Sequence, residues 1–182
     1  MIQHDENVFT NNTLGFEIKK PDDWVFMPSD WAAGFREKNL SDDEKVRQIL
    51  KMANKPLVAF YLLHDSDEYV YPTVQVICRV VAGKWNRPES LEMQINNLKE
   101  VFRNFTLLES SSDTIMAGKL GTKLSATYTL ENNEGILFDV FFRNFVVLNG
   151  SIAFNIGLSG PVDGPYACET EFDDIISSIK IR

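Results

Sequence analysis

Hydrophobic and polar positions alternate most clearly near the C-terminus, between residues 122 and 158. In the stretch 151–158 every second residue is large and apolar, and the residues between them are small or polar. This period of two predicts a β-strand with one buried face. The stretch 122–130 has the same period, and a third apolar stretch at 137–148 lies between them. The three stretches predict consecutive antiparallel strands.

The strand expected at 137–148 is apolar on both faces, since Phe142 belongs to one apolar face and Phe141 to the other. A strand of this kind is typical of the centre of a sheet that is covered on both sides. The dipeptide Asn149-Gly150 predicts a type I′ turn into the following strand, because both residues tolerate positive φ. We therefore expect a tight hairpin in the middle of the sheet and helices on both of its faces.

Three stretches carry the signals of the covering helices. Ser41 and Glu44 form a capping box, which predicts a short helix to about Met52. Residues 87–105 show an apolar stripe at helical spacing and a proline in the first turn, and a last helix is expected at 166–177. Further strands are predicted at the positions that follow: 14–19, 24–27, 57–63, 69–81, 106–111 and 113–117.

This order of strands and helices predicts an α/β fold of the α+β type, a three-layer α/β/α sandwich with a central, mainly antiparallel β-sheet. The chain has 182 residues, which suits one domain. Residues 1–12 are polar, and we expect a flexible N-terminal segment there. Residues 13–182 are expected to form the single domain.

The net charge of −8 argues against a nucleic-acid partner, because phosphate binding depends on Lys and Arg. No apolar run approaches the roughly 20 residues of a membrane-spanning helix. The first residues lack the basic and apolar regions of a signal peptide. Two compartments stay open: the protein is cytoplasmic, or it belongs to the envelope or periplasm and a signal peptide precedes Met1. Cys78 and Cys168 are expected to be buried free thiols rather than a disulfide.

Both ends of the predicted domain resemble a known family. Residues 15–24 read Gly-Phe-Glu-Ile-Lys-Lys-Pro-Asp-Asp-Trp, which is similar to the G-F-x-I-x-x-P-x-x-W start of PsbP-like proteins. The chain also closes as theirs do, with a strand from Gly150, a Pro/Gly break, and a helix ending in Ile-Ile-Ser-Ser-Ile-Lys-Ile at 175–181. The resemblance implies the α/β/α sandwich, shared with a related Ran-binding protein, and a non-enzymatic binding or assembly role. It supplies no catalytic residues.

The residues themselves offer little chemistry. His64 with Asp65, Asp67 and Glu68 is the best metal candidate, although a solvated acidic loop explains the same residues. The stretch 157–160 approaches the nucleophile elbow of hydrolases but lacks its spacing. Cys168 has one activating feature, its place in the first turn of the last expected helix. We predict no catalytic residue, no metal site and no cofactor.

Aromatic residues outside the core stripes indicate where a partner would bind. Trp31 and Phe35 lie in a stretch without periodicity, and Tyr69 and Tyr71 follow the acidic loop. Exposed aromatic side chains often anchor protein interfaces. The leading hypothesis is a non-enzymatic binding or assembly module that contacts a protein partner through these four residues. A small-ligand or metal-binding protein using loop 64–68 is the alternative, and a hydrolase is a weaker one.

Overall fold

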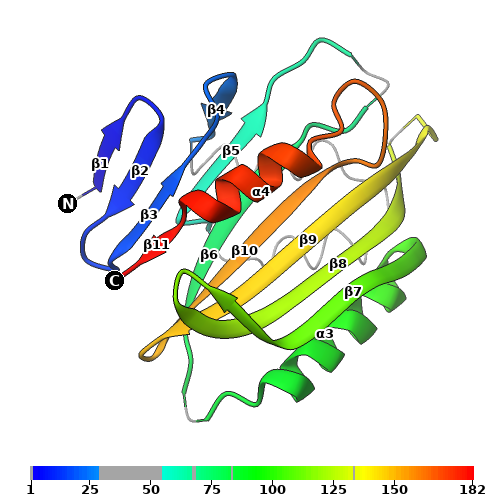
Figure 1. The fold of residues 1–182 in the computed structure, drawn as a ribbon. Coiled ribbons are helices and arrows are strands. Elements are labelled where there is room, and N and C mark those ends of the chain that lie inside the picture. Colours follow the sequence, from blue (N-terminus) through cyan, green and yellow to red (C-terminus); the bar gives the residue numbers. More distant parts are fainter. Residues whose placement is uncertain (1, 29–54, 67–68, 83, 133) are drawn as a thin grey trace.

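The computed structural model describes residues 2–28, 55–66, 69–82, 84–132 and 134–182 (Figure 1). In these ranges the larger sheet has seven strands, in the order β4 (Trp24–Phe26), β5 (Val58–Leu62), β6 (Thr73–Val80), β10 (Ile152–Pro161), β9 (Leu137–Asn149), β8 (Lys119–Glu131) and β7 (Arg103–Met116). A smaller sheet has four, in the order β1 (Ile2–Asp5), β2 (Val8–Asn11), β3 (Phe16–Lys19) and β11 (Lys180–Ile181). Every strand pair of the described residues is antiparallel, which confirms a mainly antiparallel β-sheet protein.

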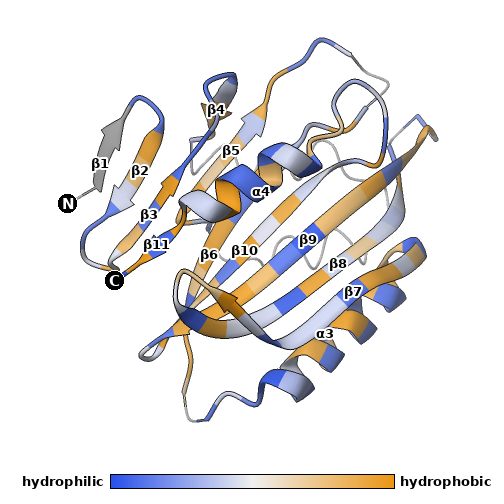
Figure 2. Cartoon of the chain, viewed as in Figure 1, coloured by the Kyte–Doolittle hydropathy of each residue, from blue (hydrophilic) through white to orange (hydrophobic). Residues whose placement is uncertain are grey.

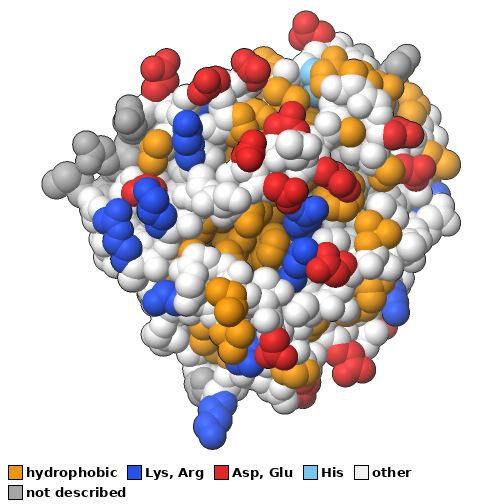
Figure 3. Space-filling model, viewed as in Figure 1, with side chains coloured by type: hydrophobic (Ala, Val, Ile, Leu, Met, Phe, Trp, Pro, Cys, Tyr) orange, Lys and Arg blue, Asp and Glu red, His pale blue; other side chains and the backbone are white. Residues whose placement is uncertain are grey.

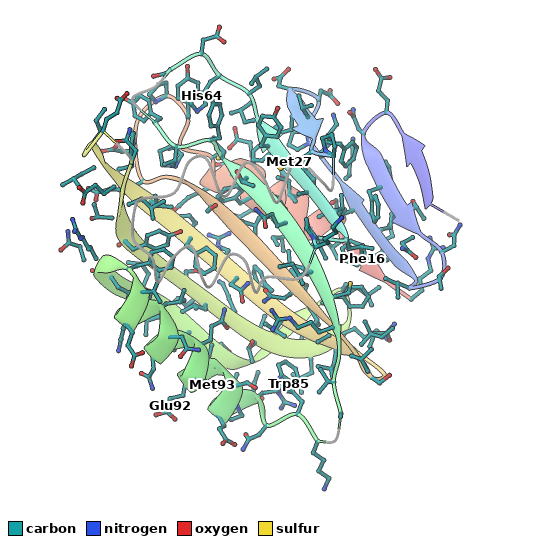
Figure 4. All side chains as sticks on the ribbon, turned by 180° about the vertical axis from the view of Figure 1, so that it is seen from behind. Phe16, Met27, His64, Trp85, Glu92 and Met93 are labelled. Carbon is teal, nitrogen blue, oxygen red and sulfur yellow. The ribbon has the colours of Figure 1, made fainter. Side chains whose placement is uncertain are left out.

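Two helices, α3 (Arg87–Val101) and α4 (Glu169–Ser178), lie on opposite sides of β9. Asn144 accepts a hydrogen bond from Gln94 of α3, whereas its neighbour Arg143 pairs with Asp173 of α4. Consecutive side chains of a strand point to opposite faces, so the two helices cover different faces of the sheet. Figure 1 shows α4 in front of the sheet, and Figure 4 shows α3 in front after the molecule is turned.

The main core lies between α4, the smaller sheet and the α4 side of the larger sheet. Phe154 of β10 is fully buried and stacks on Phe16 of β3, with ring centroids 5.0 Å apart. Trp24 is also a core residue, and its ring meets Phe60 and Phe172 edge-on. These ring contacts join both sheets and α4 into one apolar cluster, and Figure 2 shows hydrophobic positions on the strands beneath α4.

The expected central hairpin is confirmed, but its turn is placed one residue later. Asn149 pairs with Ile152, so the two turn residues are Gly150 and Ser151. Only Gly150 has a positive φ, of 62°. This matches a type II′ turn, which needs glycine at its first central position, rather than the predicted type I′ turn on Asn149-Gly150. The side chain of Asn149 donates instead to the backbone oxygen of Arg182.

The segment 1–12, expected to be flexible, contains the strands β1 and β2. Phe9 explains the difference, because its side chain is buried in the main core and holds β2 against β3. In the sequence, one apolar residue among polar neighbours did not indicate a buried strand.

The region after the long helix also differs from expectation. Helix α3 ends at Val101, and β7 begins two residues later without a loop. The two short strands expected at 106–111 and 113–117 form one strand, β7, whose pairing with β8 is interrupted by register shifts. These irregularities break the period of two, and the sequence therefore looked like two separate strands. The helix expected after Ser41 lies outside the described residues.

Candidate functional site

Tyr69 and Tyr71 lie in an aromatic cluster at one end of the larger sheet. The ring of His64 is stacked between Tyr71 and Tyr166, with centroid distances of 4.4 and 4.0 Å and interplanar angles of 18° and 17°. Tyr69 meets Tyr166 edge-on at 5.5 Å, and Tyr71 meets Tyr61 of β5 edge-on at 6.2 Å. The cluster joins the β5–β6 loop to the β10–α4 loop, and Figure 4 shows His64 at this end of the molecule.

Gly164 shapes the side of the cluster formed by the β10–α4 loop. Its φ is +86°, a conformation that favours glycine. A Cβ at this position would lie 2.6 Å from Cε1 of Tyr69. The Tyr69 ring therefore packs directly on the glycine backbone, and this close approach holds the two loops together.

Exposed apolar side chains lie in the two loops that form the cluster. Leu63 is 57% exposed in the β5–β6 loop, and Val162 is 43% exposed at the start of the β10–α4 loop. Tyr69, Tyr71 and Tyr166 are half-buried, so each presents part of its ring to solvent. Figure 3 shows hydrophobic side chains gathered around a histidine near the top of the molecule. The two loops thus hold a stacked aromatic centre and also present apolar side chains to solvent.

His64 is buried and does not have the solvated character that the sequence of its loop suggested. His64 is only 6% exposed, its Nε2 atom lies 3.4 Å from the carbonyl oxygen of Val70, and its Nδ1 atom has no hydrogen-bond partner. Asp65 is exposed, while Asp67 and Glu68 lie outside the described residues. Within the described part of the chain, no three His, Cys, Asp or Glu side chains are grouped to hold a metal ion.

The residues weighed for nucleophilic chemistry are placed unfavourably for it. Ser159 lies inside β10, paired with Thr73 and Phe142, rather than on a strand-to-helix turn. Both cysteines are free thiols. Burial raises the pKa of the Cys78 thiol to about 11. Burial and the nearby Glu171 carboxylate raise the pKa of Cys168, the residue just before α4, to about 12, which is opposite to the activation a helix start would give.

The structure brings together only part of the predicted partner surface. Tyr69 and Tyr71 belong to one cluster, while Trp31 and Phe35 lie outside the described residues. Sequence reasoning missed Tyr166, which completes the stack on His64 from about a hundred residues away. No local pattern marks such a contact, because stacking between loops depends on how the sheet brings their ends together.

The comparisons with solved structures agree with this architecture. The chain is similar to the cyanobacterial PsbP of Synechocystis, CyanoP, with 14% identity over 98% of this chain and 95% of that one and a TM-score of 0.61. It is similar to the Saccharomyces cerevisiae Ran-binding protein Mog1p, with 9% identity over 98% and 96% and a TM-score of 0.55. LpqN of Mycobacterium tuberculosis, involved in cell envelope biogenesis, has 15% identity over 91% and 82% and a TM-score of 0.51.

The chain therefore has the PsbP-like fold that Mog1p shares, as the resemblance at its two ends implied. No family model and no curated protein matches the sequence. In the described residues no helix is long and apolar enough to cross a membrane. At these identities the similarity shows the fold alone.

Proposed function

We propose that the protein is a non-enzymatic binding or assembly module, and that the aromatic cluster around His64 contacts a protein partner. The observation that supports this proposal best is that the loops holding the half-buried tyrosines also expose the apolar side chains of Leu63 and Val162. Aromatic residues set in a rigid frame lose little conformational entropy on binding, and such residues often dominate interface energies. Trp31 and Phe35 are proposed to belong to the same contact surface.

We further propose how the domain is layered and which class of macromolecule it binds. Because α3 and α4 contact opposite faces of β9, we take the domain to be a single three-layer α/β/α sandwich comprising residues 13–182, with β1 and β2 attached at its edge. The partner is a protein and not a nucleic acid, in keeping with the net charge of −8. CyanoP and Mog1p support a protein-binding role only by analogy of fold.

Site-specific photo-cross-linking tests this surface. A benzoylphenylalanine placed at Leu63 should capture one discrete partner in lysate of the source organism. The same probe at Val80 is a matched control, because Val80 is an 81% exposed apolar residue at the other end of β6. A strand of this length separates the two ends by roughly 23 Å. Identical cross-linked species at both positions would refute the proposed surface.

The predicted aromatic residues provide a second arm of the same experiment. The double substitution Trp31→Ala and Phe35→Ala should remove the species captured at Leu63 and leave the melting temperature of the protein within a few degrees. If capture at Leu63 persists unchanged, these two residues are not part of the surface.

The metal-binding alternative has a direct test of its own. Calorimetry with Ca²⁺, Zn²⁺ and Mn²⁺ should give no heat at millimolar metal, because the His64 ring is stacked on both faces and only 6% exposed. A saturable heat that Asp65→Asn abolishes would favour the loop 64–68 as a metal site instead.

A further inference from the structure

Three connecting segments lie at the end of the larger sheet that carries the aromatic cluster, and none of them contains a lysine or an arginine. They are the β5–β6 connection at 63–72, the β8–β9 connection with the start of β9 at 132–139, and the β10–α4 connection at 162–168. The strands that they join are neighbours in the order β5, β6, β10, β9 and β8. The three sequences together contain six Asp or Glu residues. This end of the sheet is therefore acidic throughout.

Each segment also exposes an apolar side chain. Leu63 is 57% exposed, Val162 is 43% exposed and Leu137 is 59% exposed, and we call these three residues the apolar row. The amide of Val162 donates to the backbone oxygen of Asp139, two residues from Leu137, so the last two members of the row are close together. Three strand steps of about 4.8 Å separate β5 from β9, and the row is thus roughly 15 Å long. Grouped apolar side chains at a surface mark an interaction site, whereas single ones do not.

A carboxylate follows each member of the apolar row by one or two residues. We call Asp65, Asp163 and Asp139 the row carboxylates, and all three residues are exposed. Within the described part of the chain none of them forms an ion pair. Asp139 accepts one hydrogen bond, from the hydroxyl group of Thr129. The negative charge beside the apolar row is therefore not neutralised by the protein itself.

Two cations of the adjoining strands and turns already have partners within the protein. Arg103, at the start of β7, pairs with Glu131 at the end of β8. Lys20, in the turn before β4, is only 6% exposed, and its Nζ atom donates to the side chain of Asn7 and to a backbone oxygen. Neither reaches the row carboxylates without losing these contacts. Figure 3 shows Asp and Glu side chains around the hydrophobic ones near the top of the molecule.

We infer that the apolar row binds a basic segment of the partner protein, in which Lys or Arg stands next to apolar residues. This inference rests on the function proposed above and specifies the chemistry of the partner. Apolar side chains of the segment cover the row, and its cations pair with the row carboxylates. Nucleic acids and anionic lipid surfaces are repelled by the same carboxylates, because like charges in contact are unfavourable. A small cation without apolar groups would leave the row uncovered.

The size of the expected effect follows from the exposure of these charges. An ion pair between exposed groups strengthens binding by a factor of only about 1.4 to 5, since water screens it. Three such pairs together are expected to contribute about tenfold. The apolar row and the row carboxylates therefore both have to be used for measurable binding of a short segment.

Titration of the full ¹⁵N-labelled chain with three short peptides tests the inference. The first, the Lys peptide, is acetyl-Leu-Lys-Gly-Leu-Lys-Leu-Lys-amide, whose leucine spacing follows the strand steps along the row. The Glu peptide has glutamate in place of lysine, and the Ser peptide has serine in place of leucine. The Lys peptide should shift the amides at 63–66, 137–139 and 162–166 and bind at least about tenfold more tightly than the other two. Raising the ionic strength from about 0.05 M to about 0.3 M should weaken it about threefold.

Two double variants of equal charge isolate the row carboxylates. Asp65→Asn with Asp163→Asn should weaken the Lys peptide about fivefold. Glu89→Gln with Glu92→Gln removes the same charge from the N-terminal part of α3 and should leave the affinity unchanged. Figure 4 shows Glu92 and His64 at opposite ends of the molecule.

A third double variant isolates the apolar row. Leu63→Ser with Val162→Thr should weaken the Lys peptide about fivefold and leave the affinity of the Ser peptide unchanged, because only the leucines use the row. Both side chains are exposed, so the melting temperature should stay within a few degrees of the original.

The cross-linking experiment at Leu63 separates this inference from the function on which it rests. The species captured there should be lost when Asp65→Asn and Asp163→Asn are introduced and kept when Glu89→Gln and Glu92→Gln are introduced. A species kept in both double variants overturns the basic segment and leaves the contact surface standing. Identical species at Leu63 and at the distant control position refute the surface itself.

Four results of the peptide titration would overturn the inference. No shift at millimolar Lys peptide would show that the row does not bind such a segment. Equal affinity of the Lys and Glu peptides would remove the role of the carboxylates. Equal affinity of the Lys and Ser peptides would indicate unspecific attraction of any polycation. Shifts at the row that depend on protein concentration without peptide would assign the row to contact between two copies of the chain.

Discussion

Gly121 and Gly157 provide a matched test of how closely the strands approach one another. Gly121 lies in β8 and pairs with Val147, and a Cβ at this position would lie 2.4 Å from the carbonyl oxygen of Val146. Gly157 lies in β10, where a new Cβ would be 3.7 Å from its nearest neighbour, Nδ2 of Asn144, an ordinary contact. The same substitution to alanine therefore clashes with the backbone at Gly121 and makes only ordinary van der Waals contacts at Gly157.

The expected magnitudes follow from these distances. Replacing glycine by alanine reduces the entropy of the unfolded chain by a similar amount at both positions, which stabilises the folded state by about 0.4–1 kcal/mol where the alanine fits. At Gly121 the Cβ must move from 2.4 Å to at least 3.0 Å from a backbone atom. Overpacking of this kind costs about 1–3 kcal/mol. Gly121→Ala should thus be destabilised by about 1–2 kcal/mol, and Gly157→Ala should be neutral or slightly stabilised.

Urea unfolding followed by tryptophan fluorescence measures this difference. With a denaturant slope of about 2 kcal/mol per molar, the two midpoints should differ by roughly 1 M. Equal midpoints would show that β8 and β9 are farther apart at Gly121 than the structure has them.

Three further predictions test other parts of the structure. Phe16→Ala should lower the free energy of unfolding by about 3–5 kcal/mol, because this fully buried ring joins the small sheet to Phe154; an effect below 1 kcal/mol, measured by urea unfolding, would contradict that packing. Gly164→Ala should lower the free energy of unfolding by about 1–2 kcal/mol, because the positive φ disfavours alanine. The new Cβ should also displace Tyr69 and change the near-ultraviolet circular dichroism of the tyrosines. An unchanged spectrum would refute the close approach. The pKa of Cys168 is raised from 9.0 to about 12, so this thiol should contain about a thousandfold less thiolate at pH 8 than an ordinary thiol. It should react correspondingly slowly with a thiol reagent. Rapid labelling of the native protein would contradict its burial.

The pH dependence of stability has a definite sign for this thiol. The folded state keeps the Cys168 proton to about pH 12, whereas the unfolded chain loses it near pH 9. Stability from this group is therefore fully present below pH 9 and falls as the pH rises toward 12, by about 1.4 kcal/mol per unit. A Cys168→Val variant should lack this share of the decline, and parallel curves for both proteins between pH 9 and 10.5 would refute it.

Local pattern determined the central part of the fold. The alternation at 151–158 predicted β10 with Phe154 and Ile156 on its buried face, and the structure places both fully inside the core. The apolar character of both faces at 137–148 predicted that β9 is covered on both sides, and α3 and α4 contact it from opposite sides. These features follow from sequence because strand period and burial are properties of a few adjacent residues.

The contacts between residues that are far apart in the chain became apparent only in the tertiary structure. Phe9 turned a polar N-terminal stretch into part of a sheet by packing into the core. Tyr166 stacks on His64, which is buried although its sequence neighbours suggest a solvated acidic loop. Ser125 and Arg143 are unremarkable in sequence, and only the register of β8 against β9 shows that their unpaired atoms share one face. Register and loop contacts depend on the whole packed sheet, and no short stretch of sequence encodes them.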